Sequence, residues 1–418
     1  MSLPDVKLTK VPGLGRRQPS DDYISALVMG GVATTATSTT AALALGTVVE
    51  LKSPQDAKGY GLNTAYDEAN AVLVYHHIAR FFKRCPSGTL YVMLVAQGTT
   101  LTDMCDATKA YAKTLLNNLQ GKVRKLAVVL NPETTYTGTA TAGIDADVLT
   151  AIPMAQALAD EEYDLHRPVD ILIEGYHFNG TATAAPDLRA LRSPQVSVVI
   201  GADKLVSDYI IAAATPFKYY AAVGDTLGTM AQANVNESIG WVDKFNLQDL
   251  QDGSFITSCL SSGLALTAYT NTDITTLYDK GYIITRYHAD KAGVFFAGAP
   301  TCAAIDDDEA FVENSATLNK ASRLVFKAYV GDINRPINLN ADGTIVPQLV
   351  GSLEAKGNTA LDAMIRRGEI SDRDVVIDPA QDFVANGEKL KIVFRIQIVG
   401  VAREIEGSIS LVARLRSN

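Results

Sequence analysis

Buried strands and amphipathic helices alternate along the first half of the chain, and this alternation is the feature that most restricts its fold. Residues 103–119 are expected to form one helix, and residues 64–83 another, because one broad face of the latter segment at helical spacing is apolar. That face consists of Ala65, Ala69, Val72, Tyr75, Ile78, Ala79 and Phe82. Short apolar segments, typical of buried strands, lie at 23–29, 47–51, 89–95, 125–130, 169–173 and 196–200. Together they predict a mostly parallel α/β sheet.

Single residues add detail to this middle region. Asp145 is expected to cap a helix over residues 145–160, and Pro153 inside that helix predicts a kink or a later start. Trp241 is the single tryptophan of the chain, and we expect it to pack in the core.

The end of the chain follows a two-residue period instead. In the segment 389–398 one face is apolar, and it is formed by Leu390, Ile392, Phe394, Ile396 and Ile398. In the segment 404–414, Ile405, Ile409 and Leu411 alternate with charged and serine residues, and Gly400 lies between the two segments. This period predicts two strands of a half-buried antiparallel sheet. The second strand runs almost to the chain end, so its backbone groups need a neighbouring strand.

Two long helices are expected before these strands, over residues 309–330 and 347–367. The acidic run 306–309 is expected to stabilise the start of the first helix, since acidic side chains suit a helix N-terminus. Two further strands are expected at 281–287 and 293–297. These elements predict a C-terminal α+β domain.

Residues 1–20 differ from the rest and have the pattern of an extended arm. Val6 and Leu8 alternate with polar residues, and Val11 follows out of step. Gly13 and Gly15 then interrupt the pattern and are candidates for a hinge. The predicted organisation is an arm over residues 1–20, an α/β domain over 21–270 and an α+β domain over 271–418, which ends in a second strand arm.

No sequence signature of cofactor, metal or covalent chemistry is present. The chain has no phosphate-binding loop of the G-x-x-x-x-G-K-[ST] type, no H-E-x-x-H and no G-x-S-x-G. His76 and His77 are adjacent, so they would point about 100° apart on a helix. The four cysteines are widely spaced, as scattered thiols are. We therefore expect no cofactor, no metal and no enzymatic activity.

Charge and hydropathy restrict the partners. The formal net charge is −9, which argues against binding to nucleic acid, because nucleic-acid binders are typically basic. The start of the chain lacks the apolar run of a signal peptide, and the most apolar span, residues 23–51, is too polar for a membrane helix. We expect a protein made in the cytoplasm and not inserted in a membrane.

Several short segments of the last half carry a resemblance to a known family. They are residues 281–287 (GYIITRY), 293–296 (GVFF), Thr301-Cys302, 311–314 (FVEN) and 319–321 (NKA), followed by the final strand pair. Residues 221–224 (AAVG) and 237–241 (ESIGW) precede them. In this order they resemble the tail sheath proteins of contractile phage tails, and in particular a short group that also occurs in prophages and phage-derived injection systems. The resemblance covers residues 1–20 and 218–418.

The resemblance implies a structural role. Sheath subunits stack in hexameric rings around a tail tube, and their terminal arms add strands to the sheets of neighbouring subunits. Here the arm residues would be Val6, Leu8, Val11, Ile405, Ile409 and Leu411, with hinges at Gly13, Gly15 and Gly400. The implied partners are other copies of the chain, the tube protein, and baseplate and tail terminator proteins. The implied location is a virion tail or phage-derived particle, assembled in the bacterial host cytoplasm.

Two alternatives remain open at this point. The first is an α/β enzyme, whose polar side chains would converge near Gln97, Glu174 or Asp203, at the carboxyl ends of the middle strands. The second is another structural virion protein, such as a capsid or tube subunit. A tube subunit would ordinarily be smaller and mostly β, which the predicted α/β region does not fit.

Overall fold

The computed structural model describes residues 21–140, 142–212 and 219–411. The predicted N-terminal arm lies outside the described residues, and with it lie Val6, Leu8, Val11, Gly13 and Gly15.

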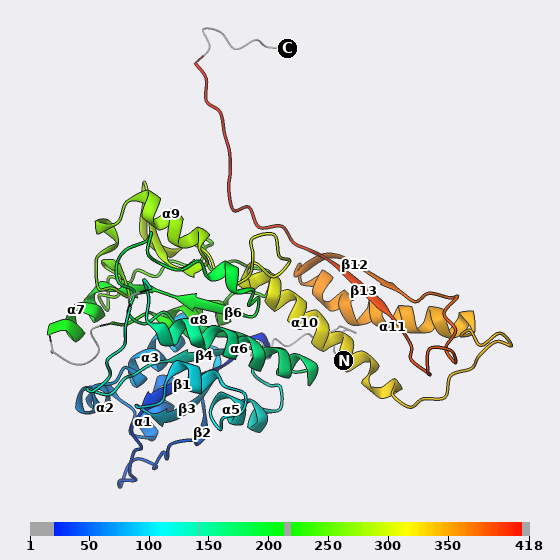
Figure 1. Ribbon diagram of the computed structural model, residues 1–418, viewed down its shortest axis with the longest axis horizontal. Helices are drawn as coiled ribbons and strands as arrows, with labels where there is room; N and C mark the ends of the chain where they lie inside the picture. Colours follow the sequence, from blue (N-terminus) through cyan, green and yellow to red (C-terminus); the bar gives the residue numbers. More distant parts are fainter. Residues whose placement is uncertain (1–20, 141, 213–218, 412–418) are drawn as a thin grey trace, which may run out of the picture.

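A seven-stranded sheet forms the centre of the described part of the chain (Figure 1). Its strands are β1 (Ile24–Gly31), β2 (Val48–Leu51), β3 (Thr89–Ala96), β4 (Lys125–Val129), β5 (Asp170–Glu174), β6 (Val196–Val199) and β9 (Tyr282–Ile283). The spatial order is β2-β3-β1-β4-β5-β6-β9. Every neighbouring pair is parallel except β2 and β3. This confirms the predicted mostly parallel sheet, whose strands are almost wholly buried because helices cover both faces.

The helices of this region are α1 (Pro54–Gly59), α2 (Thr64–Asn70), α3 (Val74–Arg84), α4 (Leu101–Cys105), α5 (Ala112–Leu119), α6 (Ala146–Asp164), α7 (Lys204–Ala212), α8 (Val223–Gln232) and α9 (Asn271–Asp279). Helices α3 and α8 pack on one face of the sheet, where Leu27 and Met29 of β1 point. Helices α4, α5 and α6 pack on the other face, against Ala26 and Val28. The result is a three-layer arrangement of helices, sheet and helices.

Two helices that we predicted as continuous are each broken in two. The segment 64–83 is interrupted between α2 and α3, because Ala71 adopts a left-handed conformation with φ 48°. The segment 103–119 is interrupted between α4 and α5, with Asp106 after the last residue of α4 in extended backbone. The predicted Asp145 cap of α6 is confirmed, since the Asp145 side chain accepts a hydrogen bond from the Asp147 amide. The helix begins at Ala146, so Pro153 lies inside it and does not delay its start.

The C-terminal elements form a second, elongated part that points away from the sheet (Figure 1). They are α10 (Val312–Tyr329), α11 (Pro347–Arg366), β12 (Ile370–Val376) and β13 (Val393–Ile398). Strands β12 and β13 pair antiparallel, and helix α11 packs on them through Leu361 and Met364. Ile392, Phe394 and Ile396 point to this cluster, as the two-residue period predicted.

Smaller elements complete the structure. The antiparallel pairs are β7 (Gly201–Asp203) with β8 (Ser258–Leu260), and β10 (Thr285–His288) with β11 (Lys291–Phe296). Short 3-10 helices are η1 (Asp21–Tyr23), η2 (Leu188–Leu191), η3 (Leu266–Ala268) and η4 (Val330–Asp332). Among the described helices, none is both long enough and apolar enough to cross a membrane.

The central sheet extends past residue 270, where we placed the boundary between the two domains. Strand β9 pairs in parallel with β6, so residues 282–283 belong to that sheet. Val294, Phe296 and Val312 are buried in the cluster that packs on one of its faces. The segment 281–287 also divides between two sheets, since β9 joins the large sheet and β10 pairs with β11.

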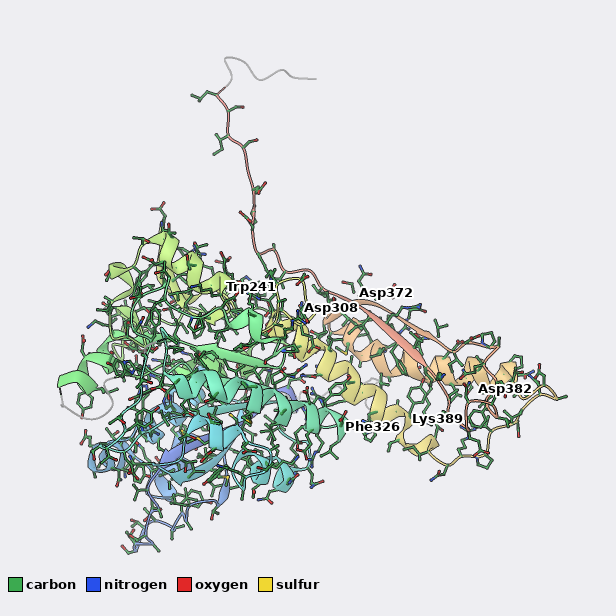
Figure 2. All side chains as sticks on the ribbon, viewed as in Figure 1. Trp241, Asp308, Phe326, Asp372, Asp382 and Lys389 are labelled. Carbon is green, nitrogen blue, oxygen red and sulfur yellow. The ribbon has the colours of Figure 1, made fainter. Side chains whose placement is uncertain are left out.

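Two local predictions in the second half are wrong. Trp241 is not in the core but is 51% exposed, and its ring faces Lys244 at 5.5 Å. The acidic run does not cap α10, because the helix begins only at Val312 and has no side-chain cap. Instead, Asp307 accepts a hydrogen bond from the Glu309 amide, and Asp308 lies in the turn before the helix (Figure 2).

Candidate assembly surfaces

The last described residues, 399–411, form an extended tail that leaves the body of the protein (Figure 1). Among the described residues, no backbone hydrogen bond involves this tail. The predicted strand over 404–414 is therefore not a strand within the single chain, and residues 412–414 lie outside the described part. The physical reason is that an extended segment becomes a strand only when another strand pairs with it.

The apolar side chains of the tail are exposed to solvent. Ile405, Ile409 and Leu411 are 88%, 101% and 103% exposed. Because their spacing is even, an extended backbone places all three on one face. Three large apolar residues on a single face of an unpaired segment favour a strand that becomes buried against a partner.

The small β12–β13 sheet offers unpaired strand edges. Among the described residues it has only two strands, so each strand keeps one open edge. One face packs on α11, while Val376, Val393 and Ile398 remain 37–48% exposed. An isolated two-stranded sheet is marginally stable, and added strands would satisfy its open backbone groups.

A cleft of about 1780 Å³ lies where the tail leaves the body. Its walls include the Trp241 loop, α9 and β10, and residues 399–405 of the tail also line it. Figure 2 shows Trp241 close to the root of the tail. The exposed tryptophan, which we expected in the core, therefore belongs to this cleft.

Arg403 fixes the root of the tail to the body. Its guanidinium lies 3.3 Å from the centroid of the Phe311 ring, and its Nη2 donates to Glu313 Oε1 at 2.7 Å. Glu313 is only 2% exposed in this pair. Gly400, the predicted hinge, lies before this contact in open space, where an added Cβ would meet nothing within 4 Å. The sequence singled out 311–314 only as part of a resemblance, and no periodicity could show that Arg403 folds back on it.

The three residues considered for the enzyme alternative make contacts within the subunit itself. Glu174 is buried, and its carboxylate accepts hydrogen bonds from the Leu130 and Ala221 amides. Burial raises its pKa to about 8, although the two amides act in the opposite direction. Asp203 forms an ion pair with Arg80 at 3.0 Å.

Gln97, the third of these residues, donates a weak hydrogen bond to the Asn70 carbonyl at 3.5 Å. None of Gln97, Glu174 and Asp203 lines the cleft at the tail root. Their contacts are those of groups that join neighbouring segments, and they do not converge on that opening.

His76, His77 and the four cysteines pack against other parts of the protein. His76 interacts with the Tyr220 hydroxyl at 3.2 Å, and burial lowers the pKa of His76 to about 3. His77 Nδ1 accepts from the Gly224 amide. All four cysteines are buried. Within the described ranges, no group of three or more His, Cys, Asp and Glu is placed to hold a metal ion.

The fold is similar to that of several solved structures. A chain of the 6-fold symmetrised baseplate of the anti-feeding prophage matches with a TM-score of 0.61 and 15% identity, over 98% of this chain and 99% of that one. A chain of the helical sheath of the anti-feeding prophage in the contracted state matches with a TM-score of 0.59 and 14% identity, over the same shares.

A third structure is the contracted PVC sheath complex of an extracellular contractile injection system. It matches with a TM-score of 0.57 and 12% identity, over 99% of this chain and 98% of that one. The chain thus has the fold of these sheath and baseplate structures along almost its entire length, and the resemblance found in the sequence is confirmed at the level of fold.

No curated protein sequence matches the chain. Two family models do match it: the DUF2586 N-terminal domain over residues 3–299 and the DUF2586 C-terminal domain over residues 308–416. Because these two matches together span almost the whole sequence, the chain belongs to the DUF2586 family.

Proposed function

We propose that this protein is the structural subunit of a contractile sheath, which polymerises around an inner tube and shortens to drive the tube through a cell envelope. The shared fold with sheath structures, over almost the full length of both chains, supports this role. Fold alone does not specify function, so the proposal depends on what the surface of this chain offers for assembly.

The observation that carries the proposal is the unpaired tail. Within the part of the chain that the structure describes, residues 404–411 present one apolar face and a backbone without intrachain partners, and the β12–β13 sheet keeps open edges. The tail extends away from its own sheet (Figure 1). The partner that fits both features is a second copy of the chain: the tail of one subunit adds a strand to the β12–β13 sheet of the next. Backbone hydrogen bonds provide affinity in such a pairing, and alternating side chains set the register.

The N-terminal arm, residues 1–20, is proposed to act in the same way, with hinges at Gly13 and Gly15. The three-domain organisation with a strand arm at each end is part of this proposal. During contraction the subunits would move as rigid bodies, while the strand links between them persist and the arms bend. No nucleotide is needed, because the energy lies in the difference between two sets of subunit contacts.

The proposed partners follow from the same role. They are other copies of the chain in stacked hexameric rings, a tube protein inside them, and baseplate and terminator proteins at the ends. The matched structures include a baseplate and a helical sheath, which supports other copies of the chain and baseplate proteins as partners. The proposed location is the tail of a phage or a phage-derived particle, assembled in the host cytoplasm. No enzymatic activity is part of the role.

Electron microscopy of the purified full-length chain, alone and with its tube protein, tests the function. Hollow, striated cylinders are the expected result. The matched variant ends at Arg403, and it should stay folded and monomeric because residues 404–411 make no contact that the fold needs. Closed shells would favour another virion protein. Cylinders formed equally well by the shortened chain would contradict strand donation by the tail.

A further inference from the structure

Helix α10 makes buried ion pairs with both ends of the described chain. Glu313, in its first turn, binds Arg403 at the root of the C-terminal tail. Lys320, two turns later, binds Asp22, the second residue after the N-terminal arm. The segments from which both proposed arms leave the protein therefore contact the same helix.

The contact at the C-terminal root depends on one arginine. Glu313 Oε1 accepts from Arg403, while Glu313 Oε2 is buried without a hydrogen-bond partner among the described residues. If Arg403 left, the carboxylate would lose its cation while remaining 2% exposed. Breaking a buried pair in this way is costly even where the intact pair contributes little net stability. The planar guanidinium also stacks on Phe311, a contact that lysine cannot reproduce.

The contact at the N-terminal root is a cluster of four charged groups. Lys320 Nζ lies 2.5 Å from Asp22 Oδ2 and 2.6 Å from Glu369 Oε1. Arg323 lies 3.8 Å from Asp22. The side chains of Lys320, Asp22 and Glu369 are at most 10% exposed. Glu369 immediately precedes β12, so this cluster also joins the N-terminal root to the sheet proposed to accept strands.

Both contacts lie on one side of α10. Glu313 and Lys320 are seven residues apart, a spacing that returns to nearly the same face of a helix after about two turns, or roughly 10 Å along its axis. Both side chains belong to the buried face of the helix. The two roots are thus held side by side at a fixed separation.

The helix is itself fixed to the central sheet. Ser315 Oγ and Asn319 Nδ2 both donate to Asp170, the first residue of β5, at 2.6 and 2.9 Å. Further along, Phe326 stacks on His166 with the ring centroids 4.1 Å apart, and Figure 2 places Phe326 on α10. These contacts make α10 a rigid support between the sheet and the elongated C-terminal part.

We propose that α10 is the common support of the two arms, with Arg403 and Lys320 as positioning residues that set the direction in which each arm leaves the subunit. A force on one arm then reaches the other through this helix. The inference rests on the proposed function for the meaning of the arms. The fixed roots, however, are a property of the single chain and are tested there.

The C-terminal root is tested by a distance measurement within one chain. Spin labels are placed at Glu404→Cys, next to Arg403 at the root of the tail, and at Thr272→Cys on α9, both exposed. The native cysteines are buried and burial raises their thiol pKa, so they react slowly. Dilution with unlabelled protein keeps the measured distance intramolecular in monomers and in polymers alike.

The wild-type tail is expected to give a narrow distance distribution, and Arg403→Gln a broad one. Arg403→Lys should lie between them, since it keeps the charge but loses the stacking. The matched control is Arg395→Gln, because Arg395 pairs with Asp374 on the exposed face of β13. Equal widths for wild type and Arg403→Gln would overturn the assignment of Arg403, whether or not the protein forms cylinders.

The N-terminal root is tested by hydrogen exchange of a peptide that covers residues 21–27. Lys320→Gln should speed exchange there, and Lys356→Gln, which removes a more exposed lysine paired with Asp332, should not. If Lys320→Gln unfolds the chain, the double variant Lys320→Gln with Glu369→Gln is measured in its place, because removing one carboxylate restores the charge balance of the cluster. Unchanged exchange in the folded variant would overturn the assignment of Lys320. If both roots proved to be fixed but the full-length protein formed no cylinders, only the proposed function would be contradicted.

Discussion

At the scale of a single residue, a substitution of Ile409 is expected to affect assembly but not folding. Its side chain is fully exposed and contacts no core, so Ile409→Asp should change the free energy of unfolding by less than about 0.5 kcal/mol. The same change should prevent cylinder formation, because a charge would enter the apolar face of the donated strand. Chemical denaturation gives the first quantity, and negative-stain microscopy with sedimentation gives the second.

Ser408→Asp is the matched control for this prediction. Ser408 is the neighbouring residue, and in an extended strand its side chain points to the opposite face. The Ser408→Asp variant should therefore still form cylinders. If both variants assembled, the apolar face of the tail would not be the contact surface. If Ile409→Asp lost stability as well, the tail would have a role inside its own subunit.

Glu174 should make stability fall as the pH rises. Its pKa is about 8 in the folded protein and 4.5 for an unperturbed glutamate, because burial disfavours the charged form. Between these values the folded state holds more protons than the unfolded state, so the free energy of unfolding decreases with pH. Glu174→Gln cannot ionise and should show a flatter decrease in urea unfolding across this range.

The decrease should not vanish in that variant. Burial raises the pKa of Asp67 to about 7, which acts in the same direction. Glu161→Gln serves as the control, because Glu161 lies on the exposed side of α6 and pairs with Lys113. Equal slopes for wild type and Glu174→Gln would show that Glu174 is already ionised in the folded protein.

At the scale of one element, two glycines of α11 should respond in opposite ways to alanine. A Cβ at Gly357 would lie 2.6 Å from the Tyr329 hydroxyl and 2.9 Å from Val375, so Gly357→Ala should destabilise by about 1–3 kcal/mol through overpacking. A Cβ at Gly351 would meet nothing within 4 Å, so Gly351→Ala should stabilise by roughly 0.5–1 kcal/mol. Urea denaturation of the two variants makes the comparison. A gain in stability at Gly357 would show that α11 and α10 are less closely packed.

The elements that the sequence predicts well are those with a strong local period. The parallel sheet, α6 with its Asp145 cap, and the face of β13 that packs on α11 all follow from spacing. The breaks at Ala71 and Asp106 do not, because they depend on where the chain must turn to reach the sheet. The end of the central sheet escapes prediction for a similar reason, since the two residues of β9 join it only through tertiary pairing.

The features of the candidate surfaces also differ in whether a local sequence pattern predicts them. The alternation of Ile405, Ile409 and Leu411 is a local pattern, so the sequence alone predicts that the tail is a strand that needs a partner. The Arg403–Glu313 pair joins positions 90 residues apart, and no local pattern contains it. Composition favours the core for Trp241, because large apolar residues are usually buried, whereas its ring lies in the cleft at the root of the tail.

For the molecule as a whole, donation and acceptance of strands are separable. In the proposed assembly the tail donates, and the β12–β13 sheet and its support on α11 do not depend on residues 404–411. A chain that ends at Arg403 thus keeps the accepting sheet and the Arg403 contact but has no strand to give. Mixed with the full-length chain, it should enter a growing cylinder by accepting a tail and then leave the next subunit without a link.

The expected result is that cylinders become shorter and fewer as the fraction of the shortened chain rises, measured by electron microscopy at constant total protein. The full-length Ser408→Asp chain, added in the same proportions, should leave the length unchanged, which controls for dilution and for altered preparations. If the shortened chain entered the cylinders without shortening them, the tail would be dispensable as a link. If it stayed out of them altogether, acceptance would require the subunit's own tail, and the two activities would be coupled through the shared support at α10.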